Sequence, residues 1–165
     1  MPETKRLVIN TGPLLALTAA TGDLALLREL YDEVVVPREV ADEIRAGGPK
    51  AFGLRQFEEA TWLSLNSDYV TVSAYLINTL DQGEAAVIQL ALDKGILVVC
   101  IDEIVGRRVA LLNNLELTGS LGVLLRASKQ GLLPDLNAAI DNMRRAGIWI
   151  GPKVLAAAFE LNSSE

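Results

Sequence analysis

Five oxygen-bearing side chains stand where apolar runs end or helical patterns begin. Asn10 follows the first apolar run, and Asp102 and Glu103 follow the most continuous one. Glu84 lies in the first turn of one helical pattern, and Glu43 lies within another. If these positions converge, several carboxylates and one amide oxygen share a pocket. Such a cluster is costly without a cation, because like charges a few Å apart disfavour one another's ionised forms.

A divalent ion with oxygen ligands would give this cluster a hydrolytic chemistry. Mg²⁺ and Mn²⁺ prefer oxygen ligands and keep several waters. A metal-bound water, deprotonated with help from a carboxylate, can attack a phosphodiester while the ion stabilises the leaving oxygen. The chain contains no histidine, which excludes Ser-His-Asp and Cys-His triads and zinc sites with His ligands.

Each of these residues also has a purely local interpretation. Asn10, before Thr-Gly-Pro, suits a turn or a helix cap. Glu84 suits a favourable position near a helix N-terminus, and Glu43 suits a solvated helix face. Asp102 and Glu103 suit caps of the helix that follows them. Only the joint placement of the five residues favours a functional site.

The elements that must position these residues alternate between strand and helix. This alternation predicts a parallel sheet covered by helices, and ligands in such sheets bind beyond the carboxyl ends of the strands. The expected strands lie at 5–10, 33–37 and 95–101, with short strand segments at 61–66, 68–74 and around 115–119. The expected helices lie at 13–22, 23–31, 38–46, 82–95, about 104–113, 120–130, 134–146 and 152–161, with a further one through Glu58 and Glu59.

Size and composition narrow the class of protein. We expect 165 residues to form a single domain over 1–165, with the helices at about 134–161 packed on it. No stretch offers eighteen uncharged apolar residues, so we expect no membrane span, and the single Cys100 favours a cytoplasmic setting. A net charge of −6 argues against a general nucleic-acid coat, although it permits a local basic rim.

The order of motifs resembles the PIN-domain proteins, and in particular the DUF3368 branch, whose members are described as VapC-like toxins. The resemblance covers about residues 6–135. It is carried by VINTGPLLAL, VVVPREVADEI, LDQGEAAVIQLALDKG, VVCIDEIVGRRVA and LTGSLGVLLRASKQGLLP, in that order. It implies an α/β/α sandwich with a central parallel sheet and an Mg²⁺- or Mn²⁺-dependent ribonuclease site. The expected partners are RNA, a cognate antitoxin protein and a second copy of the chain in a homodimer.

The resemblance also assigns roles to residues of this chain. Metal ligands are expected at Asn10, Glu84, Asp102 and Glu103, and catalytic carboxylates at Glu43, Glu84 and Asp102. Arg107 and Ser120 are expected to support the site or the substrate. Asn10 departs from the family, which usually has Asp there, and an amide brings neither charge nor basicity. The rival hypothesis is therefore a PIN-like module that binds RNA or a protein with weakened or lost catalysis. A Rossmann-type nucleotide binder is disfavoured, because no G-x-G-x-x-G follows the first strand.

Overall fold

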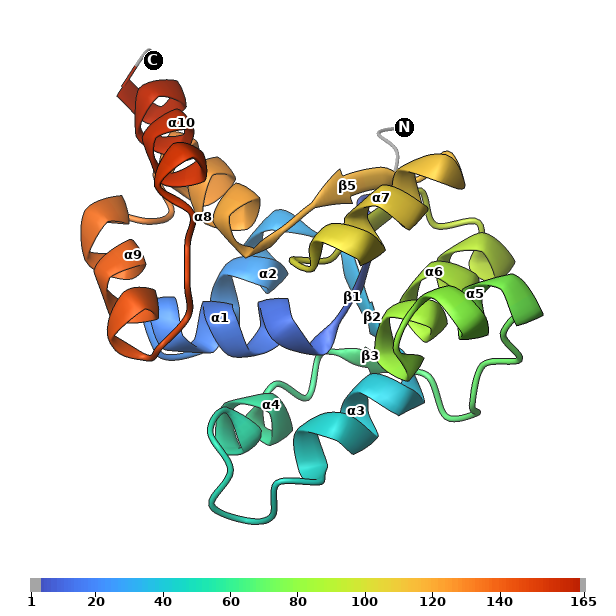
Figure 1. Ribbon diagram of the computed structural model, residues 1–165. Coiled ribbons are helices and arrows are strands. Elements are labelled where there is room, and N and C mark those ends of the chain that lie inside the picture. The colour runs from blue at the N-terminus through green and yellow to red at the C-terminus, as the bar shows by residue number, and fades with distance from the viewer. Residues whose placement is uncertain (1–3, 164–165) are drawn as a thin grey trace.

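A five-stranded sheet, parallel throughout, organises the computed structural model, which describes residues 4–163 (Figure 1). The strand order is β3-β2-β1-β4-β5. The strands are β1 (Arg6–Ile9), β2 (Glu33–Val36), β3 (Ser64–Leu65), β4 (Val98–Cys100) and β5 (Glu116–Thr118). The sheet agrees with the parallel arrangement expected from the alternation of strand and helix patterns.

Helices cover both faces of this sheet, which confirms the three-layer α/β/α sandwich. In Figure 1, α1, α8 and α9 lie on one side of the strands and α5 and α6 lie on the other. The helices are α1 (Thr11–Thr21), α2 (Ala25–Leu30), α3 (Arg38–Arg45), α4 (Leu54–Glu59), α5 (Ala74–Thr79), α6 (Gln82–Lys94), α7 (Ile104–Leu112), α8 (Ser120–Lys129), α9 (Leu136–Arg145) and α10 (Pro152–Ser163).

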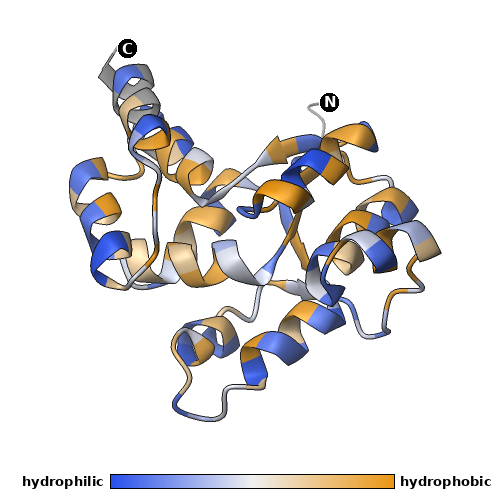
Figure 2. Cartoon of the chain, in the orientation of Figure 1, coloured by the Kyte–Doolittle hydropathy of each residue, from blue (hydrophilic) through white to orange (hydrophobic). Residues whose placement is uncertain are grey.

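The central strands are apolar because both of their faces are covered. Leu7, Val8 and Ile9 of β1 and Val99 and Cys100 of β4 are completely buried. Such continuous apolar strands are typical of parallel sheets between two helical layers. Figure 2 shows the resulting apolar colouring along the sheet and the inner faces of the helices.

The strand order reverses at β1, and this reversal defines one edge of the sheet as the place for a ligand. The chain adds β2 and β3 on one side of β1, then crosses over to add β4 and β5 on the other. The Asn10 amide donates to the Cys100 carbonyl at 3.1 Å, and the Ile101 amide donates to the Thr118 carbonyl at 3.1 Å. The carboxyl ends of β1, β4 and β5 therefore lie together at the switch point.

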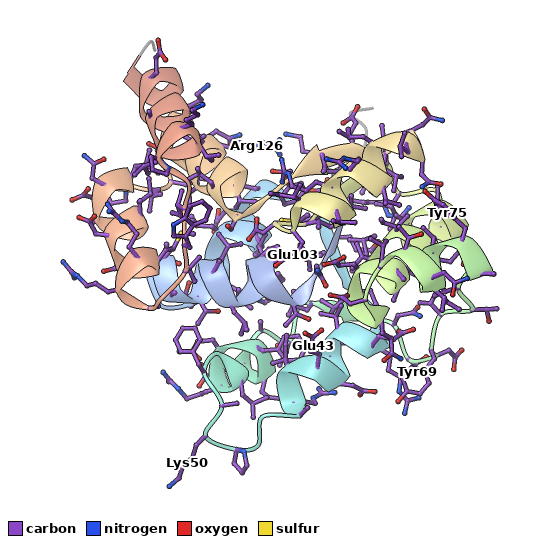
Figure 3. The ribbon with its side chains drawn as sticks, viewed as in Figure 1. Glu43, Lys50, Tyr69, Tyr75, Glu103 and Arg126 are labelled. Atoms are coloured by element: carbon purple, nitrogen blue, oxygen red, sulfur yellow. The ribbon has the colours of Figure 1, made fainter. Side chains whose placement is uncertain are left out.

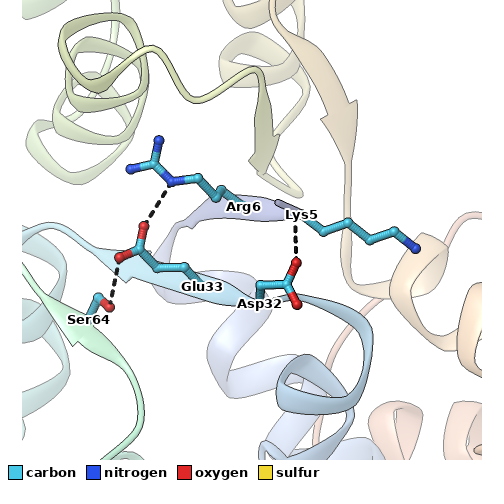
Figure 4. A network of polar contacts seen from close by, with 5 residues as sticks. All are labelled: Lys5, Arg6, Asp32, Glu33 and Ser64. Carbon is cyan, nitrogen blue, oxygen red and sulfur yellow. Dashed lines mark hydrogen bonds and ion pairs between the residues drawn. The ribbon is translucent and has the colours of Figure 1, made fainter. Parts of the chain in front are cut away.

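The opposite edge of the sheet is held by a separate polar network (Figure 4). Arg6 on β1 pairs with Glu33 on β2 at 2.9 Å, and Ser64 on β3 donates to the same carboxylate at 3.3 Å. The Lys5 amide donates to Asp32 at 2.8 Å. These partly exposed contacts connect the amino ends of three strands and take no part in the carboxyl-edge site.

The prediction of a strand at 68–74 is wrong. The Val70 amide donates to Glu39 Oε2 at 2.8 Å, and the Ser73 amide donates to Gln89 Oε1 at 3.2 Å, so side chains satisfy this backbone. Helix α5 follows, with the Ser73 hydroxyl accepting from the Leu76 amide at its N-terminus. The β-branched residues of this segment indicated a strand, but side-chain partners on α3 and α6 decided the conformation.

The last helices agree with their predicted ranges and pack on the sandwich. Helix α9 packs on α1, where Asn142 donates to the Ala20 carbonyl at 3.0 Å. Helix α10 contacts α8. Within residues 4–163, no helix combines the length and apolar character that crossing a bilayer requires.

A cavity mutation in α1 should test the packing of this core. Leu17 is 1% exposed, so Leu17→Ala should lower the free energy of unfolding by about 2–5 kcal/mol. Ile77 on α5 is 59% exposed, and Ile77→Ala should lower it by less than about 1 kcal/mol. Urea denaturation measures both values. Equal losses in the two variants would contradict the packing described here.

Candidate functional site

Two side-chain oxygens approach each other beside Gly83, in the first turn of α6. A Cβ atom on Gly83 would lie 3.0 Å from Glu43 Oε2 and 3.2 Å from Asn10 Oδ1. Thr11 donates its hydroxyl to Glu43 Oε2 at 2.8 Å, which fixes the carboxylate. A larger residue at position 83 would displace one of these oxygens, so the glycine allows them to share this space.

Asn10 has the environment of a cation ligand more than that of a cap. Its side chain is 6% exposed and makes no capping hydrogen bond to α1, and Oδ1 has no hydrogen-bond partner. Leaving a buried acceptor unpaired costs about 1–3 kcal/mol, which a bound cation would offset. The local interpretation of Asn10 as a helix cap is therefore wrong.

The donor set fits an ion that keeps most of its waters. In the described part of the chain, no three Asp, Glu, Cys or His residues lie close enough to hold a metal by themselves. Mg²⁺ is commonly bound through one or two carboxylates with water in the remaining positions. The unpartnered Asn10 amide oxygen beside the Glu43 carboxylate meets that lower requirement.

Glu84 brings buried negative charge to the same region. It is 6% exposed, and its backbone amide donates to Asp81 Oδ1 at 2.8 Å. Burial raises the pKa of Glu84 to about 7, and repulsion from Asp81, Glu103 and Glu43 adds to the rise. A cation near these carboxylates would favour the ionised form of Glu84 and reverse this effect.

Asp102, Arg107 and Ser120 form a second group at the ends of β4 and β5. Ser120 donates its amide to Asp102 Oδ1 at 2.8 Å and its hydroxyl to Asp102 Oδ2 at 2.9 Å. Arg107 donates to the Ile101 carbonyl at 2.7 Å and to the Thr118 carbonyl at 3.3 Å. Asp102 thus holds the N-terminus of α8 rather than that of α7. Arg107 connects the ends of two strands.

The predicted residues therefore fall into two neighbouring groups. Asn10, Glu43 and Glu84 gather around Gly83, and Asp102, Arg107 and Ser120 gather around Gly119, where a Cβ atom would lie 2.7 Å from Asp102 Oδ1. Glu103 makes no capping hydrogen bond to α7, and its charge contributes to the raised pKa of Glu84.

Sequence reasoning missed three residues of this region: Thr11, Asp81 and Glu39. Asp81 caps α6, accepting from the Glu84 amide, and the Asp-x-x-Glu spacing at 81–84 is a capping pattern that could have revealed it. Thr11 and Glu39 carry no comparable pattern, because their partners come from distant segments.

A cavity of about 620 Å³ opens beside the Gly83 group. Helix α3, the loop before α5 and the start of α6 form its walls. The lining residues are Glu39, Asp42, Glu43, Ala46, Tyr69, Asp81, Gln82 and Gly83. Figure 3 shows Glu43 on α3 and Tyr69 in the neighbouring loop.

A parallel sandwich with buried acidic side chains at its switch point defines the class of this protein as an α/β fold with a hydrolase-type acidic centre. The chain belongs to the PIN-domain family: the family model DUF3368, described as a PIN domain, matches residues 6–164. No curated protein matches the chain. The family match confirms the resemblance seen in the motifs, and it identifies the fold as a nuclease fold.

The raised pKa of Glu84 predicts a pH dependence of stability in metal-free protein. Between about 7 and the ordinary value of 4.5, the folded chain holds a proton on Glu84 that the unfolded chain has released. The free energy of unfolding of the wild type, measured relative to Glu84→Gln, should therefore rise as the pH falls through this range. Urea denaturation at several pH values measures the difference. A difference that is constant or falls with decreasing pH would contradict the prediction.

Proposed function

We propose that this protein is an Mg²⁺- or Mn²⁺-dependent endoribonuclease and the toxin of a toxin–antitoxin pair. The observation that carries the proposal is the unpartnered, buried Asn10 amide oxygen beside Glu43 at the carboxyl edge of a PIN-domain sheet. The adjacent burial of Glu84 supports it, because uncompensated negative charge of this kind calls for a cation.

The residues that would hold the ion are Asn10, Glu84, Asp102 and Glu103. When bound, the ion would supply an activated water and stabilise the leaving oxygen of a phosphodiester. Glu84, with a pKa of about 7 in the metal-free chain, lies in the range useful for accepting a proton at neutral pH.

The remaining residues of the two groups keep the reacting groups in place. Glu43, fixed by Thr11, is positioned to orient a water beside Asn10. Ser120 fixes the direction of Asp102 through two hydrogen bonds, and Arg107 holds the strand ends on which Asp102 stands.

The proposed partners are RNA, an antitoxin protein and a second copy of the chain, in a cytoplasmic setting. Helix α7 exposes a largely apolar face that a protein partner can cover. Its exposed apolar residues are Ile104, Val105, Leu111 and Leu112.

A second candidate function is supported by the residue type at position 10. Asn10 brings no charge to the site, and both carboxylate oxygens of Asp102 already accept hydrogen bonds from Ser120. Both features lower the expected affinity for a metal. The alternative is therefore a PIN-domain module that binds RNA or a protein without turnover.

RNA cleavage tests the first function directly. Purified protein with structured RNA and Mn²⁺ should give cleavage products, and EDTA should abolish them. Glu84→Gln should lower the rate by about tenfold or more, because the variant loses both a charge and a proton acceptor. Glu29→Gln on the exposed face of α2 is the matched control and should keep the wild-type rate. Absence of metal-dependent cleavage, with RNA binding retained, would favour the module that binds without turnover.

Metal affinity tests the proposed ligands separately from cleavage. Asn10→Asp should strengthen Mn²⁺ binding by about tenfold, since a carboxylate adds a full charge to the ligand set, and Asp102→Ala should weaken it. Isothermal titration calorimetry measures both affinities. Asn137→Asp on the exposed side of α9 adds the same charge away from the site and should have no effect. If neither Asn10→Asp nor Asp102→Ala changes the affinity, the proposed ligand set is wrong.

A further inference from the structure

Two buried side-chain oxygens without hydrogen-bond partners border the same cavity. Within the described residues, the buried side-chain polar atoms without a partner are Asn10 Oδ1 and Glu39 Oε1. Glu39 lines the 620 Å³ cavity, and Gly83, which also lines it, lies next to Asn10 Oδ1. Both atoms are acceptors, so the cavity lacks donors at two places.

Glu39 is held by one oxygen and left unsatisfied at the other. It lies on α3 and is 7% exposed, and its Oε2 accepts from the Val70 amide at 2.8 Å. A buried carboxylate with one free oxygen is costly, because burial removes the water that would otherwise solvate it. Its position on the cavity lining gives a ligand access to this side chain.

The loop that carries Val70 is fixed against α3 by further contacts. Tyr69 donates its hydroxyl to Asp42 Oδ2 at 2.6 Å, and Arg38 lies over the Tyr69 ring at 4.2 Å from its centroid. Arg38 also donates to the Ser67 carbonyl at 3.1 Å. The wall of the cavity formed by Tyr69 is therefore ordered before any ligand binds.

The charge of the cavity is negative and is not balanced by ion pairs. Four carboxylates line it, and in the described residues each takes its hydrogen bonds from neutral donors only. They are Glu39 with the Val70 amide, Asp42 with the Tyr69 hydroxyl, Glu43 with the Thr11 hydroxyl and Asp81 with the Glu84 amide. No Lys or Arg lines this cavity.

The size of the cavity favours an organic cation over a metal ion. Its volume of about 620 Å³ lies within the range of small-molecule sites, roughly 300–1,000 Å³. The described carboxylates do not converge closely enough for three of them to hold one ion. An organic dication can instead place separate N–H donors at separate carboxylates.

We propose that this cavity binds a linear alkyl diammonium compound. One ammonium group donates to Glu39 and Asp42, and the other donates to Glu43 and Asp81, on the side of Asn10. The Tyr69 ring lies beside the methylene chain and adds a cation–π contact. This binding site extends beyond the proposed nuclease function and requires neither metal nor RNA.

Calorimetry on metal-free protein at 150 mM salt tests the proposal with 1,4-diaminobutane as the probe. Butylamine, which has one ammonium group, should bind about tenfold more weakly or worse, since it loses one set of charged hydrogen bonds. Glu39→Gln keeps an oxygen acceptor for the Val70 amide and should weaken diamine binding by about tenfold. Glu29→Gln, with the same loss of charge on the exposed face of α2, should leave it unchanged.

The remaining outcomes decide between this site and the proposed metal centre. Thermal melting should show that Glu39→Gln is folded, and Asp42→Asn provides a second variant with the same expected loss of affinity. Equal affinities for the diamine and butylamine would overturn the proposal. So would a loss of diamine binding in Glu43→Gln that Glu39→Gln and Asp42→Asn do not share, because the cation would then be held beside Asn10 alone. Mn²⁺ affinity and RNA cleavage are measured separately, so failure of diamine binding leaves the nuclease proposal standing.

Discussion

Parallel pairing between β1 and β4 joins the first segment of the chain to a segment beyond its middle, and the other features depend on this contact. It brings the carboxyl ends of both strands to one edge, with the Asn10 amide bonded to the Cys100 carbonyl. Parallel strands require crossover connections, so α1, α3 and α6 must pack around these ends. The polar residues that follow the strands are thereby concentrated in one region, where the helical layers keep water away from them.

Glycines allow this concentration of polar atoms, because each stands where a side chain would collide with an acidic group. Gly83 makes room for Asn10 and Glu43, and Gly106 makes room for Glu84, whose Oε2 would lie 3.2 Å from an added Cβ. Gly119 makes room for Asp102. All three glycines lie near helix N-termini, where the helix dipole favours negative charge. Close packing and the helix dipole together stabilise carboxylates that burial would otherwise disfavour.

The carboxyl edge combines a neutral amide with an excess of acidic groups, and this combination separates two chemistries in space. Beside Asn10 and Glu43, a small hydrated cation is the complement of the oxygen atoms. Beside Glu39 and Asp42, the wider cavity and the free Glu39 oxygen complement a group that donates hydrogen bonds. Tyr69 stands between water and these carboxylates on the loop before α5. The same surplus of negative charge therefore serves different ligands according to the space that surrounds it.

The sequence by itself determined the parallel sandwich, most strand and helix positions, the PIN-domain family and the place of Asn10, Glu84 and Asp102 at strand ends or helix starts. These features depend on apolar periodicity and caps, which act over a few residues. The tertiary structure decided that 68–73 is irregular, that Asp102 bonds Ser120, and that Glu39 borders a cavity with one oxygen free. Each of these depends on which distant segments the strand order makes neighbours, and local periodicity contains no information about that order.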